Sequence, residues 1–125
     1  PPDMSVLVKA RKGGANYIYS VLVGYEDPPP GVTLDDGVYY NKYMVGNKIK
    51  MPNNLTDGLV EYADGTDSTV DQMAKDVTTF LAWAAEPELE ERHRTGVKVI
   101  IYLILLTLLV YLSMKKIWSR IDSEV

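Results

Sequence analysis

The sequence predicts a mainly α-helical protein with long irregular loops and a single membrane-spanning helix near its C-terminus. Residues 99–114 form a run of sixteen positions without a charge, and apolar residues recur at helical spacing earlier in the chain. Between the helical patterns, glycine and proline pairs interrupt regular structure repeatedly. Because the chain has no Cys, disulfides cannot stabilise its first 90 residues, which must fold by burial alone.

Two short helices are predicted at the N-terminal end. Asp3 can cap the first of them, and Gly13 with Gly14 ends it. Residues 15–23 then form a second helix, which Gly24 stops. The apolar positions of the first helix are Met4, Leu7 and Val8.

A long loop region and a third helix follow. Residues 25–66 read as loop with brief extended pieces, because a Pro-Pro-Pro-Gly turn and three Asp-Gly pairs lie within them. Ser68 and Asp71 resemble a capping box, which marks the start of a third helix. Pro87 ends this helix. The apolar face of this helix comprises Val70, Met73, Ala74, Val77, Phe80, Leu81 and Ala84.

The uncharged run predicts a single membrane span. With Lys98 and Lys115 at its flanks it makes a helix of roughly 20 residues and about 30 Å, the thickness of a hydrocarbon core. A buried core helix is the alternative, because sixteen residues is slightly short. Tyr102 and Tyr111 near the two ends favour the span. Three basic residues on each side leave its orientation open.

Charge divides the chain near the same place. Residues 1–90 carry 7 basic and 14 acidic side chains, a net charge of −7, whereas residues 91–125 carry 6 and 3, a net charge of +3. We therefore expect a head at 1–90, a juxtamembrane and transmembrane helix at 91–118 and a short tail at 119–125. The chain begins with Pro1 rather than Met, which predicts that it is the C-terminal part of a longer protein.

Several separated segments closely resemble the cytochrome c1 family, the haem subunit of the cytochrome bc1 complex. They follow that family in order and spacing along the whole chain. The segments include Pro1-Pro2-Asp3-Met4-Ser5, Lys9-Ala10-Arg11-Lys12-Gly13-Gly14, Gly24-Tyr25 with Pro28-Pro29-Pro30-Gly31, and Met73-Ala74-Lys75-Asp76-Val77 through Trp83-Ala84-Ala85-Glu86-Pro87.

The resemblance implies the C-terminal part of a class I-type cytochrome c domain followed by one transmembrane helix. It also implies haem c, held by a Cys-X-X-Cys-His motif and a Met ligand. Since this chain has no Cys, the covalent attachment and the proximal His are expected in a missing N-terminal part. By resemblance, Met51 is the axial ligand of the haem iron on the distal side.

The residues around Met51 agree with that role. Alternation along Lys48 to Met51 places Ile49 and Met51 on one side of an extended segment and the lysines on the other. A lone Met is otherwise ordinary core filler. Relatives carry a proline just before this loop, where the chain has Met44-Val45, so the rigidity of the loop is in doubt and Met44 becomes a rival ligand.

Arg11 and Tyr17 match family residues that lie close to the haem propionates. A guanidinium is permanently charged and can hold a carboxylate in a partly dry site. Without the resemblance, Arg11 reads better as a solvated residue at the end of a helix, and Tyr17 as a packing aromatic.

The resemblance further implies an electron-carrier subunit that is not an enzyme by itself. It would pass electrons from a Rieske iron-sulfur protein to soluble cytochrome c, beside cytochrome b and membrane lipid and without nucleic acid. Its head would face the periplasm or the intermembrane space, from a bacterial cell membrane or the mitochondrial inner membrane. The acidic head suits a basic cytochrome c, although exposed acids are commonly just solvated surface.

Two other classes of protein remain open. A haem-free, single-span structural or assembly protein would explain the absence of a Cys-X-X-Cys-His motif. A cell-surface protein glycosylated at Asn54 would explain the Asn54-Leu55-Thr56 triplet, a pattern frequent by chance. His93 is the only histidine and lies between two arginines at the predicted membrane entry, which favours a headgroup or solvent contact.

Overall fold

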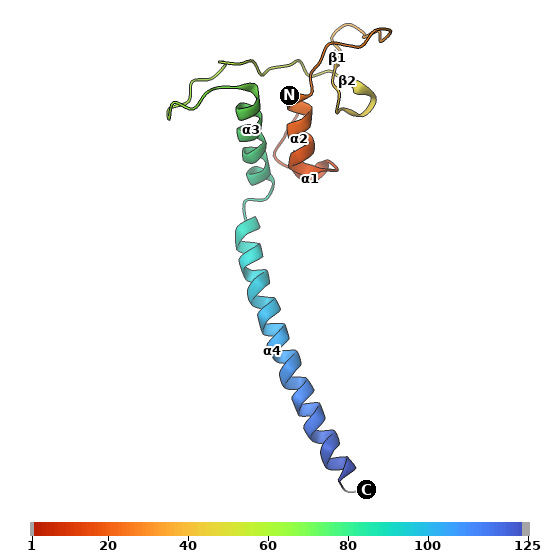
Figure 1. The fold of residues 1–125 in the computed structure, drawn as a ribbon, viewed down its shortest axis with the longest axis vertical. Coiled ribbons are helices and arrows are strands. Elements are labelled where there is room, and N and C mark those ends of the chain that lie inside the picture. Colours follow the sequence, from red (N-terminus) through yellow and green to blue (C-terminus); the bar gives the residue numbers. More distant parts are fainter. Residues whose placement is uncertain (1, 124–125) are drawn as a thin grey trace. The chain divides into compact units, whose positions relative to one another are not determined.

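The computed structural model describes residues 2–123, which are mainly helical, with long irregular stretches and one long apolar helix (Figure 1). The chain divides into two compact units, Pro1–Glu86 and Pro87–Val125. Along the chain the elements are α1 (Leu7–Ala10), α2 (Gly14–Val23), β1 (Tyr39–Tyr40), η1 (Val45–Asn47), β2 (Lys48–Ile49), α3 (Val70–Ala85) and α4 (Leu89–Asp122). The predicted fold class is confirmed.

Helix α1 is shorter than predicted, and Asp3 does not cap it. Its N-cap is Val6, whose side chain makes no capping hydrogen bond. The Asp3 carboxylate instead accepts a hydrogen bond from the Ser5 backbone N–H at 2.9 Å, as in an Asx turn. Because this turn lies before the helix, the Asp3 carboxylate bonds a turn N–H group and not a helical one.

Helix α2 forms as predicted and ends at Gly24. Gly13, with φ of 93°, precedes it in the left-handed region that glycine adopts most easily. Ile18 and Val21 are buried on one side of the helix. At the other end, a side chain on Gly24 would lie 2.6 Å from Tyr43 Cδ2 and 2.7 Å from the Ser20 carbonyl oxygen, so the close approach of the chain requires glycine there.

Helix α3 begins one residue later than the predicted capping box. Thr69, rather than Ser68, is the N-cap, and its hydroxyl accepts from the Gln72 N–H at 3.2 Å. The Ser68 hydroxyl instead accepts from the Val60 N–H at 3.3 Å. Ser68 is thus committed to the preceding loop, which leaves the neighbouring threonine to satisfy the helix.

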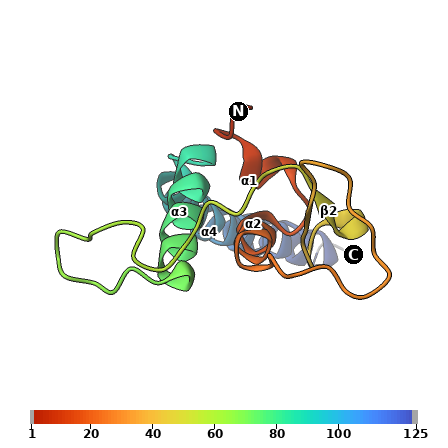
Figure 2. The same cartoon turned by 90° about the horizontal axis from the view of Figure 1, so that it is seen from above.

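The core of the first unit lies between α2 and α3, which run side by side in both views (Figures 1 and 2). Helix α1 packs against both, and Lys9 pairs with Glu86 at 3.2 Å. The core is small. Its buried apolar residues are Ile18, Val21, Met73, Ala74 and Ala85.

The loop region between α2 and α3 is irregular, as predicted, with one minimal antiparallel sheet. Tyr39 pairs with Ile49 and Tyr40 with Lys48. An isolated bridge joins Tyr25 to Asn41, which brings the end of α2 against the start of the segment that carries Met44 and Met51. The sheet therefore connects α2 to the segment with both candidate ligands.

Helix α4 is continuous from Leu89 to Asp122 and forms the second unit with the residues that flank it. Its 34 residues correspond to about 51 Å of helix, and an apolar 18-residue window within Leu89–Ile121 has a mean hydropathy of 2.4, with none of that window buried. By length and composition it can cross a membrane. The predicted tail at 119–125 is helical as far as Asp122, and residues 124–125 lie outside the described part of the chain.

Candidate functional site

The first unit contains a largely apolar cavity of about 530 Å³. Its walls come from α1, α2, α3 and the segment that follows β2, so segments far apart in the sequence meet there. A volume of this size is ordinary for a cofactor or small-molecule site. The lining residues are Pro2, Met4, Leu7, Arg11, Tyr17, Ile18, Val21, Leu22, Tyr25, Met44, Ile49, Met51, Asn53, Asn54, Leu55, Val77, Phe80 and Leu81.

All four site residues named from the sequence line this one cavity. Arg11 directly follows α1, Tyr17 lies in α2, and Met44 and Met51 lie on either side of η1 and β2. The structure therefore brings together residues that are up to 40 positions apart. Their roles toward a haem stay a prediction.

The segment before Met51 has the alternation that the sequence predicts. Ile49 and Met51 are half-buried, whereas Lys48 and Lys50 are exposed. The Met51 carbonyl oxygen accepts a hydrogen bond from the Tyr25 hydroxyl at 2.9 Å. Burial raises the pKa of the Tyr25 phenol, so Tyr25 remains a hydrogen-bond donor throughout the neutral range.

Met44 has a different environment on the same cavity. The Tyr17 hydroxyl donates to Met44 Sδ at 3.2 Å, so one sulfur lone pair is already used. Within residues 2–123, the sulfur of Met51 accepts no hydrogen bond. The two thioethers are therefore unequal as donors to a metal, and Met51 has the freer sulfur.

A single buried side chain attaches the loop before Met44 to α2. Asn41 has no exposed surface, and its Nδ2 donates to the Val21 carbonyl oxygen at 2.7 Å. Its Oδ1 accepts from the N–H groups of Tyr43 at 3.1 Å and Met44 at 3.2 Å. Asn41, which sequence reasoning did not single out, thus connects this loop to α2.

Backbone contacts around Asn41 complete this attachment. The Lys42 N–H donates to the Gly24 carbonyl oxygen at 2.9 Å, and the Asn41 N–H donates to that of Asn47 at 3.1 Å. Asn47 adopts a left-handed φ of 56°, and its Nδ2 donates a hydrogen bond to the Lys42 carbonyl oxygen at 3.1 Å. Asn is among the few residues that tolerate this conformation.

Arg11 is exposed at the rim of the cavity. Its Nη1 donates to the Ala10 carbonyl oxygen at 3.3 Å, and the residue itself has extended backbone geometry after α1. A guanidinium at the edge of an apolar cavity can bind a carboxylate that projects from it. The same position also suits a solvated arginine, so both interpretations from the sequence remain.

Helix α3 supplies a wall that sequence reasoning treated only as core. Val77 and Phe80 are 41% and 59% exposed, and both line the cavity together with Leu81. Phe80 also contacts the Trp83 ring, with centroids 6.0 Å apart. Helical spacing found these residues correctly as one apolar face, but it could not distinguish a cavity wall from a packed interface.

The donor set suits one face of a haem. The cavity offers thioethers for the iron, apolar and aromatic walls for the macrocycle, and a guanidinium for a propionate. No group of three or more His, Cys, Asp or Glu that could hold a metal occurs within residues 2–123. The described residues that line the cavity include three methionines and no Cys or His, so the iron ligand that they could supply is a thioether.

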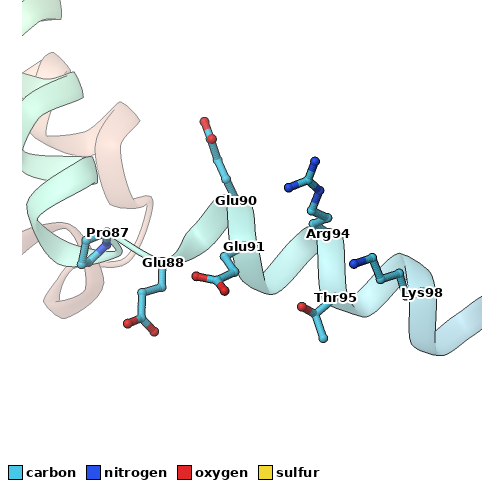
Figure 3. A pocket seen from close by; sticks show the side chains of 7 residues that line it. All are labelled: Pro87, Glu88, Glu90, Glu91, Arg94, Thr95 and Lys98. Carbon is cyan, nitrogen blue, oxygen red and sulfur yellow. The ribbon is translucent and has the colours of Figure 1, made fainter.

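A second hollow, of about 710 Å³, lies along the first turns of α4 (Figure 3). Glu90 and Arg94, one turn apart, project to the same side of the helix there. Acidic residues in the first turn and basic residues further along match the direction of the helix macrodipole. This hollow is strongly charged and open, and it shares no residue with the apolar cavity. Its lining residues are Pro87, Glu88, Glu90, Glu91, Arg94, Thr95 and Lys98.

Comparison with known proteins gives consistent similarities. The model of the Cytochrome C1 family matches residues 1–121. The chain is 54% identical over 125 residues to "Cytochrome c1, heme protein, mitochondrial" of Saccharomyces cerevisiae and 53% identical to the protein of the same name from Kluyveromyces lactis. It is 51% identical to "Cytochrome b-c1 complex catalytic subunit, mitochondrial" of Candida albicans.

Each of these three similarities covers 99% of this chain. The matched region is only 40% of the length of the relative from Saccharomyces cerevisiae and 43% of the length of each of the other two. The chain thus spans about two fifths of the length of the curated relatives it matches.

Proposed function

This chain belongs to the cytochrome C1 family, and on that premise we propose that it supplies the distal wall of a haem c site together with a membrane anchor. The whole protein would be an electron carrier of a cytochrome bc1 complex, rather than an enzyme by itself. The observation that carries the proposal is the apolar cavity that Met51, Met44, Arg11 and Tyr17 all line. Haem c, when bound, supplies a one-electron iron couple.

Met51 is the proposed axial ligand. Its thioether is a soft, neutral donor, which favours ferrous iron and raises the potential of a haem. Its half-buried position on the cavity and its unshared sulfur support this assignment over Met44. Arg11 at the rim would bind a propionate. Tyr17, whose hydroxyl donates a hydrogen bond to Met44 Sδ, would contribute the adjoining wall.

The remaining attributes follow from the family and from the charges of the chain. Residues 1–90 would complete a haem domain whose covalent attachment and proximal His come from an N-terminal part. The electron path would lead from a Rieske iron-sulfur protein to soluble cytochrome c, with cytochrome b as a neighbour in the complex. The net charge of −7 on residues 1–90 would steer a basic cytochrome c.

The names of the relatives place them in mitochondria, which supports an inner-membrane location with α4 as the single span. We propose that the head faces the intermembrane space and that the end of α4 faces the matrix. The haem-free structural protein and the glycosylated surface protein have no observation in their favour beyond the patterns that suggested them.

The test compares Met51→Leu with Met44→Leu in the haem-loaded full-length protein. Leu keeps volume and hydrophobicity but has no lone pair, so the fold should change little. We expect Met51→Leu to lower the haem potential, and Met44→Leu to leave the spectrum and the potential nearly unchanged. The reverse result would make Met44 the ligand. If neither substitution changed the haem, the distal-ligand role of this segment would be refuted.

A further inference from the structure

A tyrosine outside the predicted site contacts the backbone of the proposed ligand itself. The Tyr25 hydroxyl donates to the Met51 carbonyl oxygen at 2.9 Å, and the two residues are 26 positions apart. Tyr25 also lines the cavity and is half-buried. Its hydroxyl therefore joins the end of α2 directly to the residue proposed to bind iron.

The position of Tyr25 is itself fixed by the contacts of its neighbours. Tyr25 bridges to Asn41, and the Asn41 side chain binds the carbonyl oxygen of Val21 in α2. Gly24 allows this approach, because a side chain there would lie 3.1 Å from Asn41 Oδ1 and 2.6 Å from Tyr43. The donor that reaches Met51 is thus held against the same helix that forms one wall of the cavity.

We propose that Tyr25 is a positioning residue for the axial ligand, since its hydroxyl holds the Met51 backbone at a fixed distance from the α2 wall. The inference rests on the proposed role of Met51. Pro52 follows Met51, so the backbone beyond the ligand has no N–H group at that position with which to anchor itself. The carbonyl oxygen of Met51, which accepts from Tyr25, provides an anchor on the ligand residue itself.

The chain offers a matched control for this contact. Tyr19 lies in α2, and its hydroxyl donates to the Asp71 carboxylate of α3, away from the residues that line the cavity. Tyr19→Phe and Tyr25→Phe each remove one hydroxyl and one hydrogen bond and keep the ring. They differ in whether the lost bond reaches the proposed ligand.

The experiment uses the haem-loaded full-length protein with carbon monoxide as the probe. Carbon monoxide binds ferrous haem only when the sixth position opens, so its binding rate reports the loss of the Met ligand. Because the loss of this one hydrogen bond should let the sixth position open more often, Tyr25→Phe should raise that rate by up to about tenfold and lower the haem potential. Tyr19→Phe should leave the rate and the potential unchanged, while both variants lower the melting temperature slightly.

A double-mutant cycle separates the possible failures. If Tyr25 acts through Met51, Tyr25→Phe should have no further effect on the haem in a Met51→Leu background. If Met51→Leu changes the haem but Tyr25→Phe behaves like Tyr19→Phe, the positioning role is wrong and the ligand assignment stands. If Met51→Leu itself leaves the haem unchanged, the proposed function fails together with the inference.

A second variant disturbs the same contact from another side and covers the case in which Tyr25→Phe folds poorly. Gly24→Ala forces the end of α2 away from Tyr43 and Asn41 without touching a hydroxyl. We expect faster carbon monoxide binding in this variant also. An unchanged rate in a folded Gly24→Ala protein would refute the role of this attachment.

Discussion

Each unit of the chain has a leucine that is about half exposed, but for different reasons. Leu59 in the first unit is 54% exposed, and Leu105 in α4 is 57% exposed. Leu59 lies in a loop among acidic and turn-forming residues, whereas Leu105 lies within sixteen uncharged residues. Exposure alone therefore does not distinguish a side chain that faces water from one that faces lipid, whereas the surrounding sequence does.

The strongest challenge to this comparison is to place the same charge at both leucines. Leu105→Arg at the centre of a span should oppose membrane insertion by about 3 kcal/mol, which is more than a hundredfold in the equilibrium. Leu59→Arg should change stability by no more than about 0.5 kcal/mol. Carbonate extraction of membranes that contain each variant measures the difference, and equal retention of the two would refute the span.

A second prediction concerns the side chain that connects the loop of the first unit to α2. The long helix α4 is held by continuous backbone hydrogen bonds, whereas this loop depends on Asn41. Asn41→Ala would leave the Val21 carbonyl oxygen and two loop N–H groups without their side-chain partner. We expect a loss of about 1–3 kcal/mol in unfolding free energy. Asn16→Ala on the exposed face of α2 is the control and should stay within about 0.5 kcal/mol. Thermal unfolding of the full-length protein distinguishes them, and equal shifts would contradict the role of Asn41.

The smallest expected effect is the pH dependence of the contact between α2 and α3. The hydrogen bond from Lys75, followed by that from Tyr19, lowers the pKa of Asp71, and Asp71 in turn raises the pKa of both partners. The Asp71 contribution is therefore present above about pH 4 and lost as the pH falls below it, while the contributions of Lys75 and Tyr19 are lost as the pH rises through about 10.

Asp71→Asn should flatten both edges of that melting profile, since the amide has no charge to titrate. Asp35→Asn, in an exposed loop, provides the control and should leave the profile as it is. The effect should be modest because all three groups are at the surface. Melting temperatures recorded between about pH 3 and pH 11 provide the measurement. A profile unchanged by Asp71→Asn would show that this contact does not contribute to the pH dependence of stability.

The helices were predictable because their signals are local. Gly24 ends α2 and the uncharged run lies in α4, as the sequence indicates. The caps were less predictable, since Ser68 and Thr69 are adjacent hydroxyl residues and the loop contact of Ser68 decides between them. Asp3 failed as a cap for a similar reason, because its carboxylate is used by a turn.

Three of the four site residues named from the sequence came from a family resemblance, and the fourth, Met44, came from a departure from the family pattern. The structure gathers all four on one cavity. Their supports could not be found in that way. Asn41 sits between two tyrosines and a lysine with no pattern that predicts burial, and Tyr25 is 26 positions from its acceptor. Such contacts depend on how the loop folds back, which no local period encodes.

The bridge between Tyr25 and Asn41 closes a long excursion of the chain at its base. Residues 26–38 lie between Tyr25 and strand β1, and Gly31 and Gly37 within them have left-handed φ values with open space around them. Doubling the length of such an excursion costs only about 0.6 kcal/mol in closure entropy. Insertions and deletions there can therefore accumulate, or a reporter peptide can be spliced in, while the methionine segment keeps its register.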